Sequence, residues 1–211
     1  METKQLVIFD LDGTLVDSCA DLATAVNLMR AHFGLPALAM EAIRGYVGNG
    51  VKMLVTRALR GTNVDVDEAL QVQMPIYRAH AVDKTALYPG VYEGLRGLRE
   101  RGYILAVATN KPAESCDLIL THLGIFDWFI AVLAAGRCPV LKPAPDMINS
   151  IMETAGVTPG NTWVVGDNYT DLEAARRAGA KSIFVTYGYG ATGDEIPTYR
   201  CDTFESLMRI L

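Results

Sequence analysis

The sequence predicts an α/β fold: a doubly wound, mostly parallel sheet with helices on both faces and a helical domain inserted after the first strand. Three observations predict it. Short apolar runs alternate with helical patterns from Tyr88 onward, polar residues follow these runs, and residues 17–83 contain helical patterns without a convincing strand. The chain of 211 residues is long enough for a core domain with such an insert.

The first strand leads into an acidic turn. Leu6-Val7-Ile8-Phe9 is typical of a buried parallel strand, and Asp10-Leu11-Asp12-Gly13-Thr14-Leu15 follows it. Asp10 and Asp12 are two residues apart, so they leave the same side of an extended chain. They repel each other unless a divalent cation neutralises them or one holds a proton. One ionised carboxylate with a proton-donating partner suits phosphoryl transfer, and the alternative is a polar strand end leading into a turn.

The insert, residues 17–83, has four helical patterns. Ser18 is the expected N-cap of the first, with Asp21 at capping-box spacing, and Pro75 is expected to kink or split the last. The expected helices cover residues 18–33, 40–46, 51–59 and 67–82.

The remaining chain alternates strands and helices. The expected strands cover residues 103–108, 129–133, 162–165 and 182–186, and the expected helices 91–101, 113–123, 146–155 and 171–178.

Polar residues follow four of the strands. The first ends in Asp10 and Asp12, the second in Thr109 and Asn110, the third leads to Lys142, and the fourth ends in Asp167 with Asp171 one helical turn later. A lysine before a proline is usually solvated, and a threonine at a strand end is often a cap. Because the carboxyl ends of parallel strands share one edge of the sheet, the four strand ends together predict one site there.

This order of motifs, D-x-D-G-T, T-N, K-P and G-D-x-x-x-D, resembles the haloacid dehalogenase superfamily, specifically its phosphatases. The resemblance covers the chain nearly end to end. It implies a Rossmann-like catalytic core over residues 1–16 and 84–211, and a helical type-1 cap over residues 17–83. Local details are similar to those of the phosphoglycolate phosphatases: Asp10 to Ser18, Gly48-Asn49-Gly50-Val51, Thr109-Asn110-Lys111-Pro112, Lys142-Pro143-x-Pro145 and Tyr187-Gly188-Tyr189.

The resemblance implies a reaction and a role for each motif. A small phosphorylated metabolite, most of all 2-phosphoglycolate, is expected to be hydrolysed through an aspartyl-phosphate. Asp10 would attack phosphorus, Asp12 would act as proton donor and then acceptor, and Lys142 would neutralise the charge. The expected ligands of Mg²⁺ are Asp10, the backbone carbonyl of Asp12 and Asp167, with Asp171 acting through water or as a support. Thr109 would hold phosphate oxygens, and the other expected substrate-binding residues are Leu11, Gly13, Thr14, Asn49, Gly50 and Asn110.

The cap is expected to select the substrate, because the phosphate site is common to all substrates. The turn Val47-Gly48-Asn49-Gly50 would lower Asn49 and free N–H groups toward a small substrate. The helix from Val51 would point its positive end at a carboxylate, with Lys52 assisting. The alternative is a plain turn between two helices. Two places depart from the family pattern: Asn168 follows Asp167, and the loop before Lys142 lacks acidic residues.

Charge and composition restrict the partners. The net charge is −5 and no run of lysine or arginine stands out, so nucleic acid and anionic membrane are poor candidates. We expect a cytoplasmic enzyme with reduced thiols, since the sequence has no signal-peptide pattern, no long apolar run and four scattered cysteines. Both a monomer and a homodimer remain open.

Alternative functions also remain open at this point. A signalling receiver module uses clustered acids, Mg²⁺ and a phosphorylated aspartate, but it needs neither the insert nor Asp12. Among enzymes, a pyrophosphatase, a nucleotide or sugar phosphate phosphatase, and a phosphosugar mutase remain, although mutases of this superfamily tend to lack the threonine at position 14.

Overall fold

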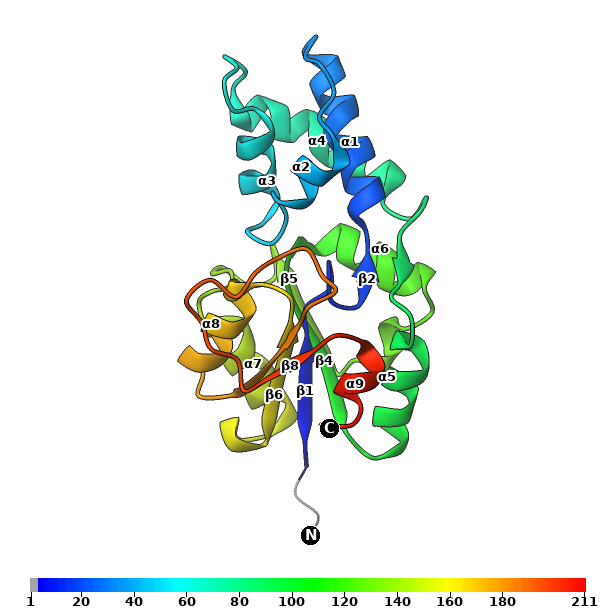
Figure 1. Cartoon of the computed structure of the whole chain (residues 1–211), viewed down its shortest axis with the longest axis vertical. Helices are drawn as coiled ribbons and strands as arrows, with labels where there is room; N and C mark the ends of the chain where they lie inside the picture. Colours follow the sequence, from blue (N-terminus) through cyan, green and yellow to red (C-terminus); the bar gives the residue numbers. More distant parts are fainter. Residues whose placement is uncertain (1–3) are drawn as a thin grey trace.

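The computed structural model describes residues 4–211, so the first three residues of the predicted core lie outside the described chain. A six-stranded sheet forms its centre, with strand order β5-β4-β1-β6-β7-β8 and parallel pairing throughout (Figure 1). This confirms the predicted fold class. The strands are β1 (Leu6–Phe9), β4 (Ile104–Pro112), β5 (Ala131–Ala135), β6 (Thr162–Gly166), β7 (Lys181–Val185) and β8 (Tyr199–Cys201).

The alternation of side chains along β1 explains why helices cover both faces. Leu6 and Ile8 pack in one cluster with α7 (Asp146–Ala155) and α8 (Tyr169–Arg177). Val7 and Phe9 pack in another with α5 (Val91–Glu100), α6 (Ala113–His122) and α9 (Phe204–Leu207). All four β1 side chains are fully buried, as expected for the central strand of a parallel sheet.

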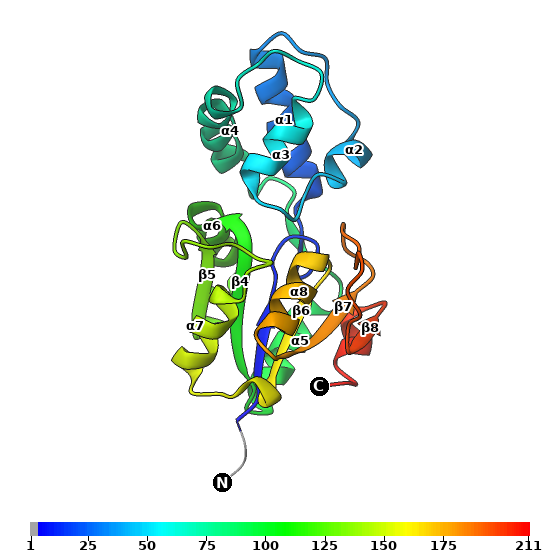
Figure 2. The ribbon, with the colours of Figure 1, turned by 90° about the vertical axis from the view of Figure 1, so that its left-hand side faces the viewer.

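Four helices lie beyond the carboxyl ends of the strands (Figures 1 and 2). They are α1 (Cys19–His32), α2 (Met40–Arg44), α3 (Val51–Ala58) and α4 (Val66–His80). The chain enters and leaves this group through two short antiparallel strands, β2 (Val16–Asp17) and β3 (Ala86–Leu87). The division into a cap of residues 17–83 and a core stays a prediction. Among the described residues, no helix is both long and apolar enough to cross a membrane.

The predicted capping box at the start of α1 is wrong. Ser18 is the N-cap residue, but its side chain makes no capping bond and instead donates to Asp12 Oδ1 at 2.5 Å. Asp21 accepts hydrogen bonds from the N–H groups of Lys84, at 2.9 Å, and Thr85, at 2.8 Å. Both side chains therefore tie together the segments that join the helices to the sheet.

Other differences concern proline and short elements. Helix α4 runs through Pro75 without splitting. Its N-cap residue is Asp65, whose carboxylate accepts from the N–H groups of Asp67 and Glu68. Strand β5 starts two residues later than expected, because a 3-10 turn covers Phe126–Trp128. The sequence did not predict β2, β3, β8 and α9, which have only two to four residues each and so no periodic pattern.

Candidate active site

Asp10 follows β1 at the carboxyl edge of the sheet and lies against Lys142. Lys142 Nζ is 3.1 Å from Asp10 Oδ1 and 2.5 Å from Asp171 Oδ1, and it also donates to the carbonyl of Ala108 at 2.5 Å. Burial acts to lower the pKa of Lys142, but the carboxylates of Asp10 and Asp171 outweigh it and raise this pKa to about 12. Lys142 therefore stays charged beside the oxygen of the expected nucleophile.

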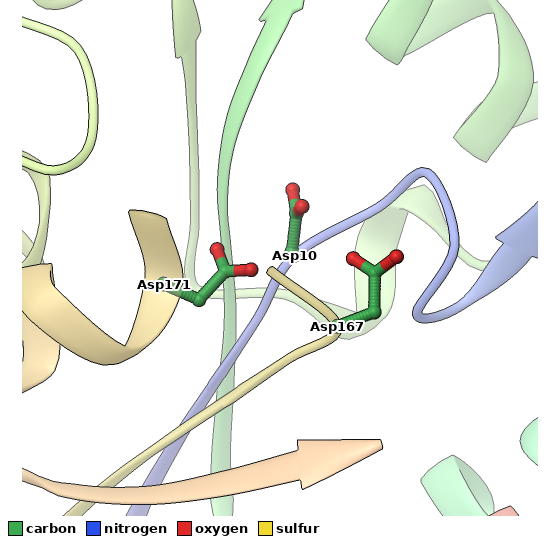
Figure 3. Close-up of side chains that lie close together, drawn as sticks. All are labelled: Asp10, Asp167 and Asp171. Atoms are coloured by element: carbon green, nitrogen blue, oxygen red, sulfur yellow. The ribbon is translucent and has the colours of Figure 1, made fainter. Parts of the chain in front are cut away.

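Three buried carboxylates gather at this edge. One oxygen each of Asp10, Asp167 and Asp171 lies within 4.8 Å of the others (Figure 3). Burial, followed by repulsion from Asp171 and Asp10, raises the pKa of Asp167 to about 8. Burial also raises the pKa of Asp171 to about 6, against the opposing effect of Lys142. Such an all-oxygen, charge-rich set fits a hard divalent cation such as Mg²⁺.

The four expected metal-binding aspartates differ in their surroundings. Asp171 accepts from Lys142 and from the N–H of Asn168 at 3.1 Å, so its carboxylate is held as a support for the lysine. The Asp167 hydrogen bonds, from the N–H groups of Tyr189 at 2.6 Å and Gly190 at 3.0 Å, both go to Oδ2. The Asp12 side chain lies outside the carboxylate cluster, in keeping with a ligand role for its backbone carbonyl alone.

Asp12 faces a second buried lysine. Lys111 Nζ is 2.9 and 3.0 Å from the two Asp12 oxygens, and it also contacts the hydroxyl of Tyr77 and lies 4.5 Å from the centre of that ring. Burial acts to lower the pKa of Lys111, but Asp12 and Tyr77 raise it on balance. The sequence motifs had not assigned a role to Lys111. Its spacing of two residues from Thr109, at the end of the same strand, was the signal that placed both on one side.

The remaining expected phosphate-site residues are buried nearby. The Thr109 hydroxyl accepts from the N–H of Lys111 at 3.3 Å. The Asn110 side chain bonds both the N–H and the carbonyl of Lys142, at 2.9 Å each, so it positions the lysine loop. The Thr14 hydroxyl is buried without a partner among residues 4–211. Gly13 has φ +80°, and a Cβ there would overlap the Asp167 carboxylate, so only glycine fits.

The cap turn lies over the site, but Asn49 is directed elsewhere. The Asn49 amide donates to the hydroxyl of Tyr169 at 2.8 Å, and its oxygen accepts from Arg57 at 2.8 Å. Gly48 and Gly50, rather than Asn49, line the pocket, so substrate binding by Asn49 stays a prediction. Lys52 is exposed and pairs with Asp67 at 2.7 Å, so its help in substrate binding stays a prediction.

A pocket of about 50 Å³ lies between the cap turn, α4 and the strand ends. Asp10, Asp12, Thr109 and Lys111 line it from the sheet. From α4, Tyr77 and Gln73 line it, and the sequence analysis identified neither. Burial raises the pKa of Tyr77 to about 12, so its phenol keeps its proton. No sequence pattern indicates Gln73, because its burial depends on the packing of the helical group on the sheet.

Comparison with known proteins assigns the family. The sequence pattern of the haloacid dehalogenase-like hydrolases matches residues 7–185. This chain belongs to that family. The predicted superfamily and the predicted enzyme class, a phosphatase of this family, are thereby confirmed, and the signalling receiver module is excluded.

Individual relatives agree with that membership. The chain is 42% identical to a phosphoglycolate phosphatase of Pseudomonas putida over 88% of this chain and 70% of that protein. It is 37% identical to a phosphoglycolate phosphatase of Psychrobacter arcticus, over 99% of this chain and 96% of that protein. The crystal structure of a predicted phosphoglycolate phosphatase from Haemophilus somnus superposes with a TM-score of 0.90 at 33% identity, covering 100% of this chain and 99% of that one.

Proposed function

We propose that this hydrolase is a Mg²⁺-dependent phosphomonoesterase that converts 2-phosphoglycolate and water to glycolate and phosphate. The observation that carries the proposal is Asp10, a buried carboxylate that lies 3.1 Å from Lys142 and lines a small pocket. The relatives named phosphoglycolate phosphatase support the choice of substrate.

In the proposed reaction Asp10 attacks the phosphorus and displaces the glycolate oxygen, which gives an aspartyl-phosphate. Asp12 donates a proton to the leaving oxygen, and then accepts one from the water that hydrolyses the intermediate and restores Asp10. Lys142 stabilises the negative charge on Asp10 and the transferring group. Thr109 and the N–H groups of Leu11 and Asn110 hold phosphate oxygens.

The metal requirement follows from the carboxylate cluster. Asp10, Asp167 and the backbone carbonyl of Asp12 would hold Mg²⁺, with Asp171 supporting the site through Lys142. When bound, the ion neutralises the carboxylates and polarises the phosphoryl oxygens.

The direct test is the initial rate of phosphate release from a panel of 2-phosphoglycolate, sugar phosphates, nucleotides and pyrophosphate, with Mg²⁺ and with chelator. We expect a Mg²⁺-dependent rate with 2-phosphoglycolate far ahead of the others. A different preferred ester would replace the substrate and keep the chemistry. Release that survives the chelator would contradict the metal requirement, and no release from any compound would contradict the proposal as a whole.

The nucleophile has its own test. Asp10→Asn is nearly isosteric but removes the attacking carboxylate, so we expect kcat to fall by at least about 10³-fold. Thermal melting of the variant serves as the control for folding. Near-normal turnover would contradict the assignment of Asp10.

A further inference from the structure

A buried polar group on the cap side of the pocket has no role in the mechanism above. It consists of Lys111 at the end of β4, and Tyr77 and Gln73 on α4. All three are at least 95% buried, with exposures of 5%, 3% and 0%. Lys142 provides the cation beside Asp10, and Lys111 is a second buried cation, paired with Asp12.

Gln73 is the most unusual member of the group. Both its amide nitrogen and its amide oxygen are buried, line the same pocket as Asp10, and have no hydrogen-bond partner in the described chain. A buried amide without partners destabilises a folded protein, so such a group is expected where a ligand completes its hydrogen bonds. The amide N–H₂ and the Tyr77 hydroxyl offer donors that a carboxylate accepts, and the Lys111 ammonium, whose hydrogen bonds go to Asp12 and Tyr77, adds a positive charge beside them.

The position of Lys111 indicates which part of a substrate it would meet. In the proposed reaction Asp12 protonates the leaving oxygen, so the leaving group lies beside Asp12. Lys111 Nζ is 2.9 Å from Asp12, which places this cation on the leaving-group side of the site. The phosphate itself lies on the other side, at Asp10 and Lys142.

The size of the pocket limits what the leaving group can be. Its volume of about 50 Å³ has room for about three to five water-sized groups, taking about 10–15 Å³ for each. Asn110, Pro112, apolar side chains and glycines complete the lining, the last two groups being Leu22, Val47, Val51, Leu54, Gly48 and Gly50. So small a pocket favours a short acid over a sugar or nucleoside as the leaving group.

We propose that Lys111, Tyr77 and Gln73 form the binding site for the carboxylate of the leaving group, and that this site makes the enzyme selective for short phosphorylated carboxylic acids. The inference rests on the proposed phosphatase function and adds the residues that determine specificity. Asn49 and Lys52, which the sequence suggested for this role, point to Tyr169 and Asp67 instead.

The test compares two substrates that differ at the carboxylate. 2-Phosphoglycolate carries it, and ethyl phosphate has a methyl group in its place. We expect Lys111→Met and Gln73→Leu each to lower the ratio of kcat/KM for 2-phosphoglycolate over ethyl phosphate by about 10–100-fold, the range for losing a hydrogen bond to a charged group. Any disturbance of Asp12 by the Lys111 variant affects both substrates and cancels in the ratio.

Gln71→Leu is the matched control, since Gln71 lies two residues away on the exposed side of α4, and its ratio should stay at the wild-type value. If Lys111→Met does not fold, Gln73→Leu still tests the site, because it replaces an unpartnered buried amide with an apolar side chain of similar size. Wild-type protein that hydrolyses 2-phosphoglycolate, with an unchanged ratio in both variants, would overturn the inference alone. Wild-type protein inactive on 2-phosphoglycolate would overturn the proposed function.

Discussion

At the scale of single residues, Asp167 shows how the fold holds an unfavourable charge in place for a ligand. The side chain is 3% exposed, and the N–H groups of Tyr189 and Gly190 fix one of its oxygens. Gly188 allows this contact, because a Cβ at that position would overlap the Asp167 side chain. Burial, followed by repulsion from the carboxylates of Asp171 and Asp10, raises the pKa of Asp167 to about 8 in the metal-free protein.

This shift predicts how the stability of the metal-free protein depends on pH. Below the ordinary pKa of 3.8 the carboxyl is protonated in the folded and unfolded states, so its contribution to stability is fully present. As the pH rises from 3.8 to about 8, the unfolded chain ionises while the folded protein must hold the proton, so stability is lost progressively until the pH passes about 8. We therefore expect Asp167→Asn to melt higher than wild type in chelator, by a margin that widens from pH 5 to pH 8.

The expected margin at pH 8 is several degrees, since about 1 kcal/mol shifts the Tm of a domain of this size by about 2–4 °C. Mg²⁺ should narrow the margin, because it stabilises only the protein that keeps the carboxylate. The exposed Asp127→Asn is the control and should show no such trend. A margin that is flat with pH would contradict the uncompensated charge.

The catalytic candidates were predictable because each stands at a fixed distance from a recognisable strand. Asp10, Thr109 and Asp167 directly follow apolar runs, and the topology of a parallel sheet brings such positions together. Gln73 and Tyr77 were not predictable, since on an isolated amphipathic helix they read as ordinary residues. Their burial beside Lys111 depends on how α4 packs against the end of β4.

At the scale of elements, α4 carries two of the proposed specificity residues and contains an interior proline. Pro75 lies between Gln73 and Tyr77 and is exposed, so no packing compensates for the hydrogen bond that it removes. The Asp65 cap and the buried contacts of Ala69, Gln73 and Tyr77 are enough to keep the helix continuous. Pro75 therefore lowers the stability of the helix, and replacing it should stabilise the protein.

We expect Pro75→Ala to stabilise the protein. Alanine is about 3 kcal/mol more favourable than proline in a helix interior, and the more flexible unfolded chain returns about 0.4–1 kcal/mol of that gain. An increase of about 2–3 kcal/mol in the free energy of unfolding, measured by urea titration, is the expected result. Pro89→Ala, in the exposed turn before α5, should give no such gain. A destabilised Pro75→Ala would mean that the local bend at Pro75 is needed to seat α4 on the core.

Prediction of the elements succeeded where patterns are long and failed where contacts decide. The 14-residue α1 and the 10-residue α5 show helical spacing over several turns. The two-residue strands β2 and β3 form because the two connecting segments pair antiparallel at the base of the cap. Ser18 and Asp21 form hydrogen bonds with these segments rather than a capping box. Tertiary contacts of this kind leave no local pattern.

At the scale of the whole molecule, a few polar contacts hold the helical cap over the sheet. Besides Lys111 with Tyr77, the Asn110 side chain donates to the Gly48 carbonyl at 3.2 Å, and Asn49 donates to Tyr169 at 2.8 Å. Arg44 donates to the carbonyl of Gly188 at 2.8 Å and lies 5.1 Å from the centre of the Tyr189 ring. The same loop, through Gly190 and Tyr189, holds Asp167, so closure of the cap and the metal site share one segment.

Arg44 separates closure from chemistry, because it holds the cap but does not line the catalytic pocket. The hydrogen bonds of Arg44 to the carbonyls of Tyr187 and Gly188 and its cation–π contact stabilise this arrangement by about 1–2 kcal/mol, so their loss shifts the closed-to-open ratio by about 5–30-fold. We expect Arg44→Ala to raise KM for the preferred phosphoester several-fold, with a smaller effect on kcat at saturation, where substrate holds the cap closed. The radius of gyration measured by solution X-ray scattering without substrate should rise as well.

Arg60→Ala, at an exposed arginine of the same helical group, is the matched control and should leave both quantities unchanged. An Arg44→Ala enzyme with wild-type KM and radius of gyration would show that the contacts of α4 and the Gly48 turn alone keep the cap closed.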